Sequence, residues 1–217
     1  MLRVVGGLFA DYHFAVPGEE EHVKGAQAVQ RVKRWLEGTM RVSQSYTNTD
    51  GAWSRKLTLH WPHGNQRPFS YDLGGMMRGG EWDGQMFCAE VKWRRKASDQ
   101  GTEYPSFLAK CYVAMSQGYL LGDHYMWISW APFRANDWDQ LTGPEMIRKA
   151  VLAESERVFG VADPESAAEF LKEEVIAELS ARLWLVVMSE KQEKLVPLDD
   201  WRGVVANFYT SNGRSAW

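Results

Sequence analysis

Three charged residues have the types and spacing of a metal-dependent hydrolytic site: Asp72, Glu90 and Lys92. Residues 86–93 are predicted to form a β-strand, on which side chains alternate between the two faces. Glu90 and Lys92 therefore project to the same side, while Val91 points into the core. Asp72 ends the preceding predicted strand, where it can meet Glu90 across the strand pair.

Two carboxylates that converge on one point repel each other unless a cation lies between them. Oxygen ligands of this kind suit Mg²⁺ or Mn²⁺. Such a metal lowers the pKa of a bound water and withdraws charge from a phosphoryl oxygen. A neighbouring lysine can orient the water or stabilise the developing charge. The residue types therefore predict phosphodiester hydrolysis with Mg²⁺ or Mn²⁺ as the cofactor.

The acid that partners Glu90 depends on the register of a long predicted hairpin. Residues 74–84 are rich in glycine and are predicted to form its turn. Asp83 lies seven residues before Glu90 and would replace Asp72 as the ligand if the register slipped. Asp72 is preferred, because Asp83 sits among the glycines of the predicted turn.

The elements that must position these residues follow from the hydropathy pattern. Helices are predicted over residues 19–37, 105–121, 143–159 and 164–180. Strands are predicted over residues 40–47, 55–61, 66–71, 86–93, 124–133 and 183–188, and residues 200–217 have no clear pattern. Strands separated by crossover helices predict an α/β fold, with a central mixed β-sheet of about five strands flanked by helices. The 217 residues are expected to form a single domain, 1–217.

Asp72, followed by Glu90-Val91-Lys92, resembles the motif of the PD-(D/E)XK nuclease superfamily, which has the restriction-endonuclease-like fold. The resemblance covers a nuclease-like core of about residues 19–133, with a C-terminal helix-helix-strand extension over about 143–217. It implies that Asp72 and Glu90 are metal ligands, the Val91 carbonyl a further ligand and Lys92 the catalytic lysine. Tyr71 stands where the motif has proline, at a position that varies widely in the superfamily.

The resemblance also implies an acid on the first core helix and polar residues on the helix after the lysine strand. Glu21 is the best candidate for the acid, because it shares a helical stripe with Gly25 and Ala28, and Glu19 and Glu20 are close rivals. Lys110 and Gln117 are seven residues apart, so they share a helix face and are candidates for nucleic-acid contacts.

The net charge of −3 does not by itself indicate nucleic acid, but the basic residues cluster. The candidate phosphate contacts are Arg94, Arg95 and Lys96 after the lysine strand, with Arg31 and Arg34 on the first helix. Residues 143–180 instead hold nine acidic and four basic residues. DNA is the expected partner, and a homodimer or a partner protein is expected to supply targeting, because the sequence has no recognisable DNA-reading module.

Several function classes lack their sequence signals. Two cysteines, Cys88 and Cys111, are too few for a disulfide framework and are expected to be buried thiols. His60 and His63 flank Pro62, which argues against a zinc site. No apolar run is long enough for a membrane helix, and the protein is expected to be cytoplasmic without a membrane partner. The alternative to a nuclease is a non-catalytic binding or assembly module on a degenerate nuclease fold, with its 11 tryptophans as contact surface.

Overall fold

The computed structural model describes residues 17–39, 41–64, 67–93 and 100–196 and the short pieces 203–204, 207–208 and 211, with backbone alone for 17–22. Its centre is a five-stranded sheet in the order β1-β4-β5-β6-β7. The strands are β1 (Val42–Thr47), β4 (Leu73–Met77), β5 (Met86–Lys92), β6 (His124–Ser129) and β7 (Leu183–Val187). β1, β4 and β5 pair antiparallel, whereas β5, β6 and β7 pair parallel. The predicted α/β class with a central mixed sheet is confirmed.

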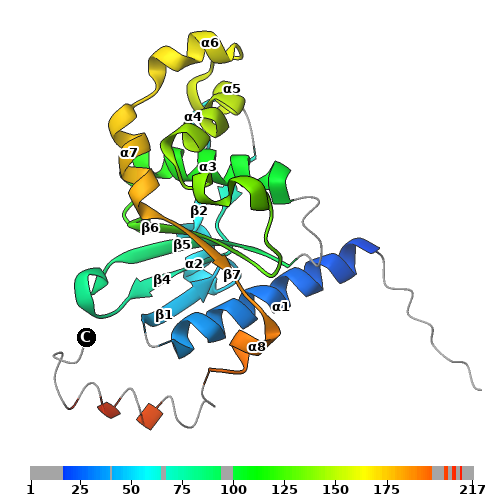
Figure 1. Ribbon diagram of the computed structural model, residues 1–217, viewed down its shortest axis with the longest axis vertical. Helices are drawn as coiled ribbons and strands as arrows, with labels where there is room; N and C mark the ends of the chain where they lie inside the picture. Colours follow the sequence, from blue (N-terminus) through cyan, green and yellow to red (C-terminus); the bar gives the residue numbers. More distant parts are fainter. Residues whose placement is uncertain are drawn as a thin grey trace, which may run out of the picture.

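Helices α1 (Pro17–Gly38) and α3 (Gln100–Ser116) cover the two faces of this sheet (Figure 1). α1 packs through Ala28, Val32 and Leu36, which recur at four-residue steps on one side of the helix. These residues share an apolar cluster with Val91 of β5, whereas Cys88 of the same strand belongs to the cluster around α3. The alternation of β5 thus divides its side chains between the two helix layers.

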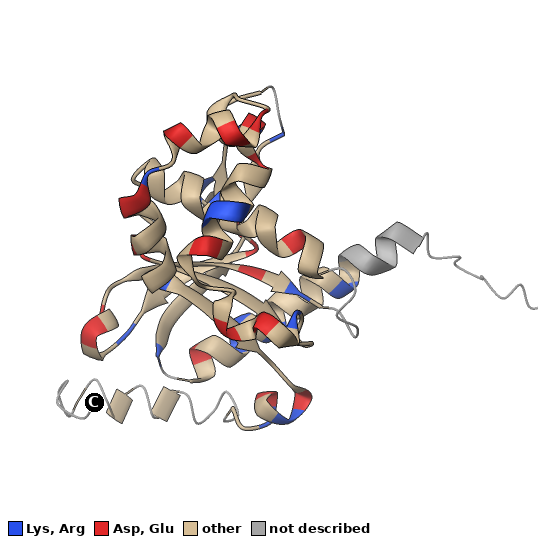
Figure 2. Ribbon diagram, turned by 45° about the horizontal axis from the view of Figure 1, so that its top comes forward, with Lys and Arg blue, Asp and Glu red and all other residues tan. Residues whose placement is uncertain are grey.

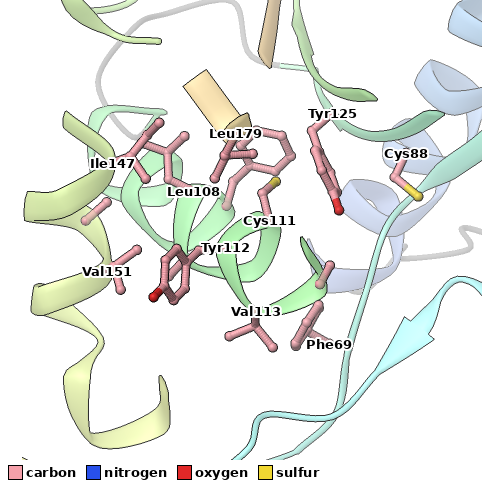
Figure 3. Packing of buried hydrophobic residues seen from close by; sticks show 14 of the residues in the cluster. Phe69, Cys88, Leu108, Cys111, Tyr112, Val113, Tyr125, Ile147, Val151 and Leu179 are labelled. Carbon is pink, nitrogen blue, oxygen red and sulfur yellow. The ribbon is translucent and has the colours of Figure 1, made fainter. Parts of the chain in front are cut away.

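A second helical layer packs on α3. It contains α4 (Pro144–Ala153), α5 (Ser155–Phe159), α6 (Pro164–Ala167), η3 (Ala168–Phe170) and α7 (Glu173–Arg182). Figure 3 shows Leu108 and Tyr112 of α3 among Ile147 and Val151 of α4 and Leu179 of α7. β7 then returns from α7 to pair with β6. The predicted C-terminal extension therefore shares a hydrophobic core with residues 19–133 and adds a strand to their sheet.

The predicted hairpin strand over residues 66–71 is wrong: the strand that pairs with β5 is β4, most of which lies inside the predicted turn, whereas Phe69–Ser70 belongs to a separate two-stranded sheet. Gly74 and Gly75 lie inside β4, and the turn follows Met77 with η1 (Gly80–Trp82). A Cβ on Gly75 would lie 2.5 Å from the carbonyl oxygen of Gln44 on β1. These glycines allow close packing within the sheet and do not mark a turn.

The predicted strand over residues 55–61 is wrong in its first half. Residues Gly51–Lys56 form helix α2, and only Thr58–Leu59 form a strand, β2, which pairs with β3 (Phe69–Ser70) in a separate two-stranded sheet. Trp53 stacks on Tyr46 of β1 with ring centroids 4.1 Å apart, and Leu57 is fully buried four residues later. This four-residue spacing is helical, and packing against β1 determines the element.

Other boundaries differ by a few residues. α3 begins at Gln100 and includes Pro105, which the sequence pattern places near a helix start, and it ends at Ser116 instead of residue 121. β6 ends at Ser129 instead of residue 133, and the predicted helices 143–159 and 164–180 are each interrupted. The additional elements are η2 (Ala135–Gln140) and α8 (Glu190–Glu193).

Charge is distributed unevenly over these layers. In Figure 2, ribbon segments coloured red for Asp and Glu recur along the helices above the sheet, in the region where the sequence holds its excess of acids. Within the described ranges, no helix combines the length and apolar character needed to cross a membrane.

Candidate active site

The backbone of β5 fixes the position of Asp72. Asp72 directly precedes β4, and its amide donates a hydrogen bond to the carbonyl oxygen of Ala89 at 3.0 Å. Its Oδ2 accepts a hydrogen bond from the amide of Val91 at 2.9 Å. β4 pairs with β5 only as far as Ala89, so Glu90 and Lys92 extend past the paired part of the hairpin. The carboxylate of Asp72 therefore lies against the end of β5 that β4 leaves unpaired and β6 pairs on its other edge, beside Glu90.

Glu90 and Lys92 project to the same side of β5 and contact each other. Nζ of Lys92 lies 3.0 Å from Oε1 of Glu90, and the Glu90 residue is only 7% exposed. α3 contributes two more charges: Glu103 Oε2 lies 3.1 Å from Nζ of Lys92, and Nζ of Lys110 lies 3.6 Å from Oε1 of Glu90. The site thus combines three carboxylates with two ammonium groups.

Burial and a neighbouring negative charge strongly raise the pKa of Asp72. Burial raises the pKa of its carboxyl group, and the charge of Glu90 raises it further, to about 7. The hydrogen bond from Val91 and the charges of Lys92 and Lys110 lower this pKa without cancelling the rise. For Lys92, burial by itself lowers the pKa, but Glu90 and Glu103 outweigh burial, so the net pKa is above its ordinary value. The metal-free site therefore carries a carboxyl group that is costly to ionise.

This perturbation predicts how Asp72 affects stability as pH changes. The pKa is raised in the folded state, so the stabilising contribution of Asp72 is fully present below its unfolded pKa of about 4 and is lost as pH rises through about 7. Asp72→Asn removes the charge and keeps an oxygen that can accept from Val91. We expect this variant, without metal, to exceed the parent in stability by about 2–4 kcal/mol at pH 8. Denaturant unfolding at pH 8 and pH 4 measures this, and a variant less stable than the parent at pH 8 would contradict it.

The oxygen atoms at this site fit a hard divalent cation. Oε2 of Glu90 is buried and has no hydrogen-bond partner among the described residues, while Asp72 uses only Oδ2 to bind Val91. The Val91 amide faces Asp72, and the carbonyl of a strand residue points to the same side as its amide. Asp72, Glu90 and the Val91 carbonyl can therefore hold Mg²⁺ or Mn²⁺ together, with water completing the coordination.

The described residues supply no third metal-binding carboxylate to join Asp72 and Glu90. Within the part of the chain that the structure describes, no group of three or more His, Cys, Asp or Glu side chains is arranged to hold a metal ion. Glu21 lies in α1, one turn before Gly25, a residue that lines the cleft described below, but its side chain lies outside the described residues. The same applies to its rivals Glu19 and Glu20.

A cleft of about 930 Å³ opens onto the two carboxylates. It is lined by residues of α1 between Val23 and Arg31, by residues 47–49 at the end of β1, and by Asp72 with residues 90–93. Lys24, Arg31 and Lys92 are the basic residues of this lining, while Glu103 and Lys110 lie outside it. The carboxylates are thus reachable from solvent beside positive charge, which an enzyme acting on a phosphodiester requires.

Other predicted residues lie elsewhere. Asp83 is exposed in the turn at the opposite end of the hairpin, where its Oδ1 accepts from the Gly79 amide, so the preference for Asp72 over Asp83 agrees with the geometry.

Gln117 is exposed just after α3 ends, about 10 Å along the helix axis from Lys110. Cys88 and Cys111 are buried free thiols, as expected. Arg94, Arg95 and Lys96 lie outside the described residues.

Arg31 is held by the C-terminal part of the chain. It makes a bidentate pair with Glu193 of α8, at 2.8 Å and 2.6 Å, and its guanidinium lies 4.2 Å from the ring centroid of Trp93 and 4.9 Å from that of Trp130. Trp130 Nε1 also donates to Glu193. Burial by itself raises the pKa of Glu193, but these hydrogen bonds outweigh it and leave the pKa below its usual value. A phosphate contact by Arg31 would require this pair to open, while Arg34 is exposed on the same helix.

We therefore predict that Arg31 acts mainly as an anchor for α8. Arg31→Ala should lower stability by about 1–2 kcal/mol, because a bidentate pair and two cation–π contacts are lost. Arg31→Lys should recover only part of this, because an ammonium cannot form the bidentate pair. Melting temperatures measure the effect. If Arg31→Ala melts like the parent and instead weakens DNA binding at low salt, Arg31 is a phosphate contact and the anchor interpretation fails.

Sequence reasoning missed two contacts of cleft-lining residues, those of Glu103 with Lys92 and of Glu193 with Arg31. Glu103 is seven residues before Lys110, so both fall on one face of α3. The signal was present in the spacing, but a helix start at residue 105 left Glu103 outside the predicted element. Glu193 lies 162 residues from Arg31, and no local pattern connects them.

No family model and no curated protein matches this chain. Among solved structures it is similar to the Moraxella osloensis Cap4 SAVED/CARF-domain containing receptor, with 9% sequence identity and a TM-score of 0.35. The match covers 80% of this chain and 34% of that chain, so this chain spans about a third of the receptor's length. A similarity at this level shows neither a shared activity nor membership of the PD-(D/E)XK superfamily, which stays a prediction from the sequence.

Proposed function

We propose that this chain is a metal-dependent nuclease that hydrolyses phosphodiester bonds, with DNA favoured over RNA. The observation that carries the proposal is the convergence of Asp72 and Glu90 on an open cleft, with Lys92 3.0 Å from Glu90. Asp72, Glu90 and the Val91 carbonyl would hold Mg²⁺ or Mn²⁺. When bound, such a metal supplies an acidified water and a Lewis acid for a phosphoryl oxygen.

The chain's own groups have distinct tasks in this proposal. Lys92 presents its ammonium to the attacking water or to the negative charge that develops on the phosphate. Lys24 at the cleft contributes positive charge that favours a nucleic-acid backbone. Asp72 must be ionised to bind a cation, so metal affinity should increase as pH rises through about 7.

The test is incubation with plasmid, linear duplex DNA, single-stranded DNA and RNA, each with Mg²⁺, with Mn²⁺ and with chelator. Cleavage that requires the metal, and that Asp72→Asn abolishes, would support the proposal. Asp83→Asn is the matched control, because it removes an acid from the opposite end of the same hairpin. A protein that cleaves none of these substrates and does not melt higher with either metal would contradict the proposal.

A second function has support of its own, a non-catalytic binding or assembly module. Glu90 already contacts two ammonium groups, those of Lys92 and Lys110, so most of its charge is compensated without a metal. The melting temperature of such a module would not respond to Mg²⁺ or Mn²⁺, whereas ligand binding to the native state raises it. The metal dependence of melting therefore distinguishes the two functions even before a substrate is known.

The cellular setting of a nuclease of this kind would be restriction, phage defence or DNA repair. A cytoplasmic location, and a homodimer or a partner protein that supplies targeting, belong to the same proposal. Size-exclusion chromatography coupled to light scattering would test the dimer.

A further inference from the structure

Lys92 lies between two carboxylates that come from different layers of the fold. Its Nζ is 3.0 Å from Glu90 Oε1 on β5 and 3.1 Å from Glu103 Oε2 in the first turn of α3. Oε1 of Glu90 is also 3.6 Å from Nζ of Lys110. The four groups thus form a continuous set of contacts with alternating charge, Lys110 to Glu90 to Lys92 to Glu103.

A metal at the proposed site would weaken only one of the two ion pairs of Lys92, the pair with Glu90. A cation bound by Asp72 and Glu90 would take up negative charge that now faces Lys92, and so weaken the attraction between Glu90 and the ammonium. Glu103 does not line the cleft, and its ion pair with Lys92 involves neither proposed side-chain ligand. Its attraction for Lys92 would therefore persist.

Lysine has a long flexible stem, so an ammonium held only by a weakened Glu90 pair and by the ring of Trp127, whose centroid lies 5.5 Å from its Nζ, samples many positions. The exposed side-chain fractions of Lys92 and Glu103, 21% and 32%, make their pair partly buried and less screened than a surface pair. We propose that Glu103 is a positioning residue that keeps the Lys92 ammonium at the cleft when a metal occupies Asp72 and Glu90. This inference rests on the proposed nuclease function, because it needs the metal site.

The test compares the parent with Glu103→Gln by amine labelling and mass spectrometry, with and without Mg²⁺. Without metal, Glu90 still holds Lys92, and labelling of Lys92 should be similar in the two proteins. With Mg²⁺, labelling of Lys92 should rise about five-fold in the variant and less than about two-fold in the parent. The matched control is Glu145→Gln, which removes a carboxylate from the first turn of α4 that also pairs with a base, Arg148.

Kinetics supply the second readout. Glu103→Gln should lower kcat about ten-fold with KM within about two-fold, because the ammonium is misplaced while substrate binding is kept. Glu103→Asp retains a carboxylate and should recover part of kcat, which a purely structural role in α3 would not predict.

The outcomes separate this inference from the proposed function. If the parent cleaves and Glu103→Gln matches it in kcat and in Lys92 labelling with Mg²⁺, Glu103 does not position Lys92, while the nuclease proposal stands. If the parent neither cleaves nor responds to metal, the nuclease proposal fails, and this inference fails with it.

Discussion

Asp72→Asn is expected to abolish metal-dependent cleavage while leaving a folded protein that is more stable than the parent at pH 8. The variant loses a metal ligand, so its rate should fall at least about 100-fold, toward the level seen with chelator. Its melting temperature should also stop responding to Mg²⁺ or Mn²⁺, because no ion then binds preferentially to the native state. Cleavage assays beside thermal melts, with Asp83→Asn as control, measure both effects. Cleavage at the parent rate would remove Asp72 from the site.

Glu90→Gln should be equally inactive but less stable than the parent. Glu90 is buried and faces the ammonium groups of Lys92 and Lys110, so removing its charge leaves two cations without their shared partner. The crowding of two carboxylates suggests that loss of either one would relieve repulsion. Because Lys92 of β5 and Lys110 of α3 both contact Glu90, we expect a gain in stability only when Asp72 is replaced.

Lys92→Met is the second substitution with a large expected effect, a fall in kcat of at least about 100-fold with metal binding retained. Methionine fills a similar volume but cannot donate a hydrogen bond to water or stabilise developing charge. Because the proposed ligands remain, added Mg²⁺ should still raise the melting temperature.

The control for Lys92→Met is Lys56→Met, which removes an ammonium that packs on Trp53 away from the cleft. A Lys92→Met protein that loses its response to Mg²⁺ together with its activity would show that Lys92 supports the metal site instead of the chemistry. One that keeps the parent kcat would remove Lys92 from the mechanism.

Part of the candidate site could be predicted from short-range geometry. The period of two in a strand places Glu90 and Lys92 on one side and Val91 on the other, whatever the rest of the chain does. The strongly apolar, aromatic run that begins at His124 predicts the buried interior strand β6. Asp163 before Pro164 predicts the start of α6, where Asp163 Oδ2 accepts from the Ser166 amide.

The secondary-structure predictions from the sequence fail where packing competes with the local preference of a residue. Gly74 and Gly75 have a composition typical of turns, yet the approach of Gln44 and Leu57 leaves no room for side chains there, so these glycines lie in β4. Pro105 indicates a helix start, yet α3 begins five residues earlier, with Gln100 fully buried and its Nε2 donating to the carbonyl oxygen of Ala131. In both places, residues distant in sequence determine the element.

The sequence by itself determined the α/β class and the placement of Glu90 and Lys92 on one side of a strand, because both depend on periodicities within single elements. Only the tertiary structure decided that α3 places Glu103 against Lys92 and Lys110 against Glu90, and that α8 places Glu193 against Arg31. These pairs join different elements, and their distances depend on how whole helices pack against the sheet. The spacing of residues along one helix or strand carries no information about that packing, which the buried apolar faces on both sides of the sheet determine together.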